Sequence, residues 1–82
     1  MDIAVEISFY PLERDFVPPI QDLIDRLQAH ASLKVVSNSM STQVSGEYDT
    51  VMAALARELR PGLERDVKSV YVMKLLGPLP AY

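Results

Sequence analysis

Hydrophobic and polar positions alternate along the first segment of the chain. Between Ile3 and Phe9 the odd positions are apolar, whereas the even positions are small or polar. A period of two is typical of a strand that buries one face. The pattern predicts a strand that begins at Ile3 and ends at Pro11, because proline cannot donate to a strand ladder.

The period changes from two to a helical spacing after a loop that contains Pro18 and Pro19. Proline suits the first turn of a helix, where its missing N–H leaves no bond unmade. The apolar positions that follow recur at i, i+3, i+4 and i+7, and they are Ile20, Leu23, Ile24, Leu27 and Ala31. The spacing predicts a helix that begins near Pro18 and packs one face.

Two short strands are expected next, joined by a polar turn. Residues from Leu33 to Asn38 include β-branched side chains, and Ser37 to Ser41 is polar enough to turn the chain back. Thr42 to Tyr48 then alternates as a strand does, and Asp49 is placed to cap a following helix. The segment therefore predicts a β-hairpin that leads directly into a helix.

The last third of the chain repeats the order of helix and strand. Apolar residues at helical spacing run from Val51 to Leu59, and Pro61-Gly62 is typical of a helix end. Ser69 to Leu76 is rich in Val and Tyr and predicts a final strand, after which a proline-rich tail begins at Gly77. The expected order is strand, helix, strand, strand, helix, strand.

This order predicts a ferredoxin-like α+β sandwich, in which two helices cover one face of a four-stranded antiparallel sheet. We expect one domain over residues 1–82, with 77–82 as an extended tail. The expected helix-facing set is Ile3, Val5, Ile7, Phe9, Val44, Val70 and Val72, with Gly46 allowing a helix to approach closely. The expected set on the uncovered face is Ala4, Glu6, Ser8, Tyr10, Gln43, Ser45, Glu47, Tyr71 and Met73.

Composition narrows the possible functions. The 82 residues include no cysteine, a single histidine and no basic stripe, and the net charge is −3. These features disfavour a metal centre and nucleic-acid binding, and the apolar runs are too short to span a membrane. We expect a cytoplasmic protein without a cofactor. Because so short a chain buries little surface, and because the uncovered face mixes aromatic and polar residues, a homodimer through the sheet, or a tetramer, is expected.

Candidate catalytic groups are few. His30 lies near the expected end of the first helix, where capping or a surface position is the simpler interpretation. Glu6 and Glu47 are candidates for a carboxylate pair across the two central strands, although an interface role is the stronger interpretation while the register is unknown. Basic residues cluster at the end of the second helix and beyond it, namely Arg57, Arg60, Arg65 and Lys68. An anion site is one interpretation of this cluster, and the simpler one is that cations are ordinary partners of a helix C-terminus.

Two motifs in this order resemble those of the small thiamine-binding proteins of the YkoF-like superfamily. The first strand reads Glu6-Ile7-Ser8-Phe9-Tyr10-Pro11, similar to a strand that ends in Ser-x-x-Pro. The hairpin reads Met40-Ser41-Thr42-Gln43-Val44-Ser45-Gly46-Glu47, similar to Met-x-Thr-x-(aliphatic)-x-Gly-Glu, and an acidic helix start follows at Asp49. Each motif is short, and their joint order and spacing carry the resemblance.

The resemblance implies a ferredoxin-like protein that binds thiamine, or its hydroxymethylpyrimidine half, without turnover. YkoF proteins carry two such units in one chain; this sequence has one, as a single-domain member would, so a homodimer would supply the second. Ser8 and Thr42 match the motif, and neighbouring Tyr10, Asn38, Ser39 and Gln43 join them as candidate ligand contacts, with Glu6 and Glu47 as secondary carboxylates. Local backbone hydrogen bonding is the competing interpretation of the serines and threonines.

Two other functions stay open at this stage. One is a dimeric α/β-barrel enzyme of the small monooxygenase or isomerase kind, for which only Tyr10 and Tyr71 are suitably placed aromatics. The other is a structural or regulatory assembly module, which a fully covered sheet face would favour.

Overall fold

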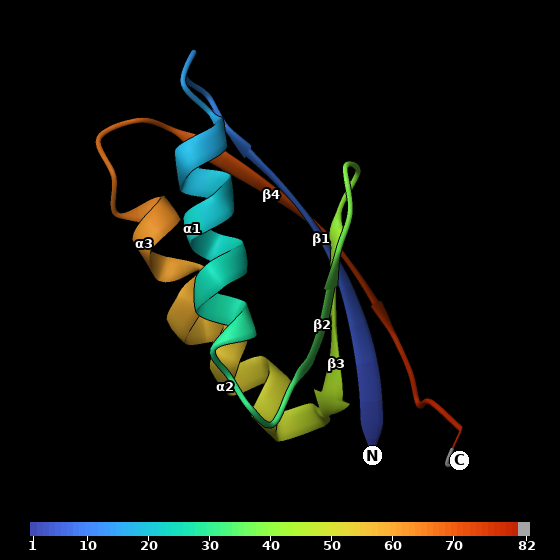
Figure 1. Cartoon of the computed structure of the whole chain (residues 1–82). Helices are drawn as coiled ribbons and strands as arrows, with labels where there is room; N and C mark the ends of the chain where they lie inside the picture. Colours follow the sequence, from blue (N-terminus) through green and yellow to red (C-terminus); the bar gives the residue numbers. More distant parts are fainter. Residues whose placement is uncertain (81–82) are drawn as a thin grey trace.

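A computed structural model, which describes residues 1–80, contains a four-stranded antiparallel sheet covered on one face by helices (Figure 1). The strands lie in the order β2-β3-β1-β4. The elements are β1 (Asp2–Pro11), α1 (Val17–Gln28), β2 (Lys34–Ser37), β3 (Thr42–Glu47), α2 (Tyr48–Glu58), α3 (Arg60–Leu63) and β4 (Ser69–Leu76). The ferredoxin-like architecture expected from the sequence is confirmed.

Strand β1 is central, and its alternating pattern explains the core. Its odd residues from Ile3 to Phe9 are buried and face the helices, as predicted. They pack with buried residues of α1, β3 and α2, which are Leu23, Leu27, Val44, Val51, Ala54 and Leu55. Burial of this apolar surface is the main stabilising term for so small a fold.

The predicted faces of β4 are wrong. Val70 and Val72, expected to face the helices, are 44% and 50% exposed. Tyr71 is paired with Phe9 in the sheet register and its ring stacks on the Phe9 ring, with centroids 4.5 Å apart. Alternation in an edge strand defines two faces without saying which is buried, and here the register with β1 places Tyr71 on the helix side.

The predicted start and end of the second helix also need correction. Glu47, rather than Asp49, is the N-cap of α2, and its carboxylate accepts a hydrogen bond from the Thr50 N–H at 3.0 Å. Pro61 and Gly62 do not simply end the helical region, because they form the short helix α3 after α2 has ended at Glu58. Proline fits there because it occupies the first turn of α3.

Beyond Leu76 the described residues 77–80 form no helix or strand, and the rest of the expected tail, residues 81–82, lies outside the described part of the chain. The Leu79 N–H nevertheless donates to the Asp2 carbonyl at 2.8 Å, which holds this segment beside β1. None of the helices described in residues 1–80 is long and apolar enough to cross a bilayer.

Candidate functional site

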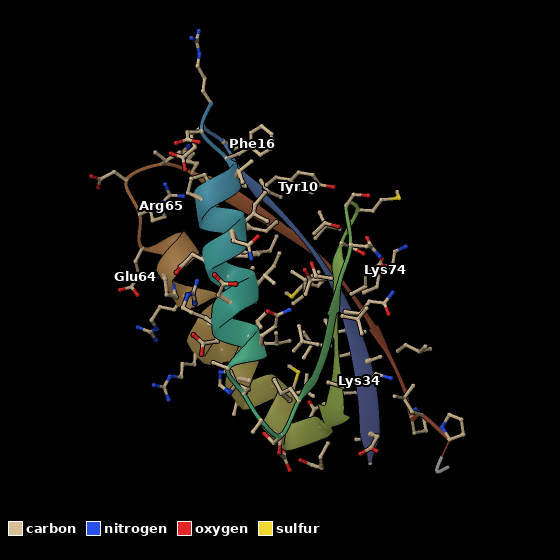
Figure 2. The ribbon with its side chains drawn as sticks, viewed as in Figure 1. Tyr10, Phe16, Lys34, Glu64, Arg65 and Lys74 are labelled. Carbon is tan, nitrogen blue, oxygen red and sulfur yellow. The ribbon has the colours of Figure 1, made fainter. Side chains whose placement is uncertain are left out.

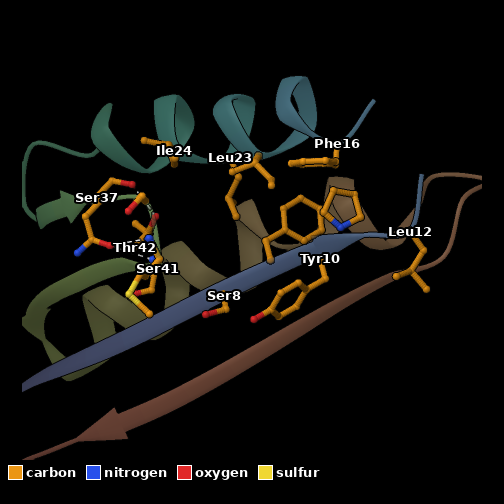
Figure 3. A pocket seen from close by; sticks show the side chains of 15 residues that line it. Ser8, Tyr10, Leu12, Phe16, Leu23, Ile24, Ser37, Ser41 and Thr42 are labelled. Atoms are coloured by element: carbon orange, nitrogen blue, oxygen red, sulfur yellow. Dashed lines mark hydrogen bonds between the residues drawn. The ribbon is translucent and has the colours of Figure 1, made fainter. Parts of the chain in front are cut away.

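A cleft of about 410 Å³ lies between α1, the second half of β1 and the tip of the β2–β3 hairpin (Figure 3). We call it the α1–hairpin cleft. Its lining consists of Ser8, Phe9, Tyr10, Pro11, Leu12, Phe16, Ile20, Leu23, Ile24, Ser37, Asn38, Ser39, Met40, Ser41 and Thr42. Both sequence motifs of the resemblance therefore contribute residues to one site.

The cleft exists because β1 is longer than its neighbour β3. Pairing between these strands stops at Ile7 opposite Thr42, whereas β1 pairs with β4 as far as Pro11 opposite Ser69. The space beyond the end of β3 is bounded by α1 instead of by a strand. Helix α1 supplies an apolar wall on that side, and its Leu23 and Ile24 side chains point toward the cleft in Figure 3.

Aromatic rings bound the end of the cleft near the start of α1. Phe16 precedes the helix and is 52% exposed, and Tyr10 of β1 is 53% exposed. Figure 2 shows both rings near the N-terminal end of α1, whereas Lys34 and Lys74 lie on the sheet side of the molecule. Flat aromatic surfaces of this kind are suited to stack on a planar ligand.

Polar groups gather at the hairpin end of the cleft. The Asn38 side-chain carbonyl accepts hydrogen bonds from the Met40 and Ser41 N–H groups, at 2.8 and 3.1 Å, and so fixes the turn. The hydroxyls of Ser37 and Thr42 share a hydrogen bond of 3.0 Å across the base of the hairpin. A fixed hydroxyl group can donate and accept, which favours a ligand edge that carries both functions.

Five of the eight predicted ligand residues line the cleft. Asn38, Ser39 and Thr42 do so from the hairpin, and Ser8 and Tyr10 do so from β1. Figure 3 shows the Ser8 and Tyr10 side chains on the side of β1 that faces away from α1. These two residues therefore border the cleft from the uncovered face, whereas Thr42, which is 6% exposed, lies on its inner side.

The three remaining predicted residues do not line the cleft. Gln43 is exposed on β3, opposite Glu6 in the sheet register. The Glu6 carboxylate accepts a hydrogen bond from the Ser41 hydroxyl at 3.2 Å, so it reaches the cleft only through a lining residue. Its other oxygen lies 3.8 Å from the Lys74 ammonium.

The suggested pairing of Glu6 with Glu47 is wrong. Glu47 lies opposite Asp2, at the far end of the sheet from the cleft, whereas Glu6 lies opposite Gln43. Hydrogen bonds from the Thr50 and Asp49 N–H groups lower the pKa of Glu47, as its capping role requires. The sequence could not reveal this separation, because the register between β1 and β3 depends on their packing.

Several lining residues were not among the candidates from the sequence. Ile20, Leu23 and Ile24 appeared only as the apolar face of a helix, which gave no sign that part of this face borders a cleft. Ser41 appeared as a turn residue and within the hairpin motif, but not as a candidate ligand contact. Phe16 lies in a loop without a periodic pattern, so only the packing of α1 on the sheet shows its position.

The histidine lies in a separate cluster with Glu58, at the other end of α1. His30 Nε2 is 2.6 Å from one Glu58 carboxylate oxygen, and Arg26 Nη1 donates to the other at 3.0 Å. The His30 hydrogen bond, with the Arg26 hydrogen bond after it, lowers the pKa of Glu58. Through these hydrogen bonds Glu58, which is only 9% exposed, joins the end of α2 to α1. None of its residues lines the α1–hairpin cleft.

The described residues hold no group of three or more His, Asp or Glu side chains arranged for a metal ion. The lining of the α1–hairpin cleft includes hydroxyl groups, the Asn38 amide and an apolar wall.

Comparisons with known proteins identify the fold. A protein from Streptococcus pneumoniae superposes with a TM-score of 0.84 at 22% identity, covering 96% of this chain and 89% of its own. A hypothetical protein from Methanocaldococcus jannascii gives 0.80 at 21% identity, with coverages of 99% and 84%. A candidate thiamine biosynthesis/salvage protein from Thermotoga maritima gives 0.79 at 19% identity, with coverages of 92% and 82%.

No protein-family model matches the sequence, and no curated protein matches it. At identities of 19–22% the similarity to these structures concerns the fold alone.

Proposed function

We propose that this protein binds thiamine, or its hydroxymethylpyrimidine half, without catalysing a reaction. The observation that carries the proposal is the α1–hairpin cleft, to which both motifs of the resemblance contribute. An aminopyrimidine has a flat apolar face and an edge with a donor and an acceptor. The cleft offers an apolar wall on α1, aromatic rings at one end and hydroxyls at the other.

Two further features support this ligand class. One solved protein with the same fold is named for thiamine biosynthesis or salvage. The Glu6 carboxylate accepts a hydrogen bond from the hydroxyl of Ser41, which lines the cleft. It thereby provides negative charge near the cleft for the cationic thiazolium of thiamine. The barrel-enzyme alternative gains no comparable support, because His30 is held by Glu58 away from the cleft.

Isothermal titration calorimetry with thiamine and with hydroxymethylpyrimidine tests the proposal. We expect saturable binding, and a Thr42→Val variant should bind about tenfold more weakly because it loses one hydroxyl contact. Ser45→Ala is the matched control, because Ser45 lies on the same strand but outside the cleft lining. This variant should bind both ligands with the affinity of the wild type. Absence of heat at millimolar concentrations of both ligands would contradict the proposal.

We also propose that two copies associate through the sheet face opposite the helices, called the open face below. Five large apolar side chains on this face are exposed, namely Tyr10, Val36, Val70, Val72 and Leu76. A two-fold contact would place this surface against itself, so apolar groups would meet apolar groups. Burial of the open face would also close the side of the cleft that Ser8 and Tyr10 border.

A further inference from the structure

Strand β1 has a free edge inside the α1–hairpin cleft. Its pairing with β3 ends at Ile7, but its pairing with β4 continues without interruption from Ala4 to Pro11. The residues after Ile7 therefore have a strand on one side only. On the other side they face the cleft and the hairpin tip.

The hydrogen bonds at the two ends of β1 show which of its backbone groups point to that free edge. The Leu12 N–H donates to the Lys68 carbonyl, on the β4 side, and the Tyr48 N–H donates to the Met1 carbonyl, on the β3 side. Successive residues of a strand direct their N–H and C=O groups to opposite sides. The backbone N–H and C=O groups of even-numbered residues of β1 are therefore directed to β4, and those of odd-numbered residues are directed to β3.

Phe9 is the odd-numbered residue that lies beyond the end of β3. Its N–H and C=O are directed to the β3 side, where the pairing has ended and where the cleft that Phe9 lines is found. Neither group takes part in a backbone or side-chain hydrogen bond among the described residues outside the strand ladders. The next odd residue, Pro11, has no N–H, and its carbonyl accepts from the Glu13 N–H at 2.9 Å. Phe9 thus presents an adjacent donor and acceptor on one edge.

The side chain of Phe9 holds these groups in place. Phe9 is 9% exposed, and its ring stacks on the Tyr71 ring, on the helix side of the sheet. The Tyr71 hydroxyl in turn donates to the Leu59 carbonyl at 3.0 Å, which ties the pair to the end of α2. A backbone donor and acceptor held by a packed core are arranged for a ligand before it arrives.

We propose that the N–H and C=O of Phe9 recognise a planar heterocycle in which a ring nitrogen lies next to an exocyclic amino group. The ring nitrogen accepts a hydrogen bond from the Phe9 N–H, and the amino group donates to the Phe9 carbonyl. The ligand edge thereby takes the place that the next residue of β3 would have occupied in the ladder. This inference rests on the proposed function and specifies how the pyrimidine half would be selected.

The α1 wall explains why a flat ring suits this position. Leu23 and Ile24 of α1 line the same cleft as Phe9, so a ring bonded to the strand edge has apolar surface on its α1 side. The hydroxyls of Ser41 and Thr42 lie at the hairpin end, within the same lining, for a polar substituent of the ring. A 4-oxo ring reverses the donor and acceptor, and it can pair with Phe9 only when turned over, which moves its substituents away from those hydroxyls.

Nuclear magnetic resonance of the ¹⁵N-labelled protein tests the inference. The labelled protein is titrated with 4-amino-5-hydroxymethyl-2-methylpyrimidine and, separately, with its 4-oxo analogue. With the amino compound the Phe9 amide proton should move downfield and its exchange with solvent should slow at least tenfold. The Ser8 amide, which faces β4, is the internal control and should show little change in exchange.

The outcomes separate the two proposals. Protection of the Phe9 amide, with at least tenfold weaker binding of the 4-oxo analogue, supports the inference. Binding of the amino compound with an unchanged Phe9 amide overturns it and leaves the proposed function standing. Equal affinity for the two compounds also overturns it. If neither thiamine nor the aminopyrimidine binds, the proposed function fails and this inference fails with it.

Discussion

At the residue scale, Gly62 shows why a small side chain is needed where α3 meets the sheet. A Cβ atom at this position would overlap the Tyr71 hydroxyl and would lie 3.1 Å from Cζ of Phe9. Gly46, which the sequence marked for close helix approach, is less constrained: its Cβ would meet Leu33 and Val51 at 3.4 Å, an ordinary contact distance. Of these two glycines, Gly62 is therefore the one that packing requires.

We expect Gly62→Ala to lower the free energy of unfolding by about 1–3 kcal/mol, because the new methyl group displaces the Tyr71 hydroxyl from its hydrogen bond with Leu59. Urea denaturation measures this change. Gly46→Ala is the control and should be close to neutral, whereas the larger Gly46→Val should be destabilising. Equal stability of Gly62→Ala and the wild type would contradict the packing described for Tyr71.

Glu58 is a second residue whose role is evident only from its tertiary contacts, which are with Arg26 and His30. From the end of α2 its carboxylate forms hydrogen bonds with Arg26 of α1 and with His30, which follows α1, and these hydrogen bonds lower its pKa. A carboxyl group with a lowered pKa in the folded state stabilises the fold above the pKa of the unfolded chain. That contribution is lost as the pH falls through the lower, folded-state value.

A Glu58→Gln variant should therefore lose about 1–2 kcal/mol of stability at pH 7, a modest loss because the Arg26 and His30 side chains are 25% and 24% exposed. Urea denaturation followed from pH 7 to below pH 4 measures the dependence, with Glu64→Gln on the exposed surface as control. The difference between variant and wild type should shrink on acidification. A constant difference would show that the charge of Glu58 contributes nothing.

Among the secondary-structure elements, the junction between β3 and α2 has a structural role. Its residue Glu47 was a candidate ligand contact on the sequence pattern, but it caps a helix in the structure. Glu47 ends β3 and caps α2 through Thr50, at the opposite end of β3 from the cleft. Helix capping fixes the first turn of α2, whose Val51 is fully buried in the core. The motif of the resemblance thus joins a helix cap to a cleft lining.

Glu47→Ala should lower the melting temperature by roughly 4–8 °C, the shift typical for loss of one cap in a domain of this size. Thermal denaturation followed by circular dichroism measures it. Asp49→Ala is the matched control, because Asp49 lies in the first turn without being the cap, and it should have the smaller effect. Affinity for thiamine should be unchanged in both variants; a selective loss in Glu47→Ala would place Glu47 in the site after all.

At the scale of the whole molecule, the two faces of the sheet differ in what covers them. The helices cover one face, and the open face presents exposed apolar side chains from three of the four strands, β1, β2 and β4. Because the side chains of β4 lie on the faces opposite to those predicted, Val70 and Val72 add to this surface instead of to the core. Exposed apolar surface of this kind favours association.

We expect the wild type to sediment at micromolar concentration as a species larger than the 9.2 kDa monomer. Val72→Lys should shift it to the monomer, because a charge would be buried in the centre of the contact. Leu63→Lys is the control, since Leu63 is 63% exposed on α3, away from the open face. A wild type that sediments as a clean monomer would contradict association through the sheet.

The order of the elements and most of the core follow from patterns in the amino-acid sequence. Periods of two and of 3.6 residues are local properties, so β1, α1 and the hairpin could be predicted from spacing alone. The hairpin motif also marked Thr42, and the adjacent turn marked Asn38 and Ser39; all three line one end of the cleft. Local signals sufficed for these features because each depends on neighbours in the chain.

The tertiary structure decided what depends on strands and helices that are distant in sequence. The register with β1 set the buried face of β4 and separated Glu6 from Glu47. The cleft itself arises because β3 begins only at Thr42, opposite Ile7, while β1 continues beyond Ile7 beneath α1. A single strand specifies two faces and two edges, and only its packed neighbours determine which face is buried and which edge stays free.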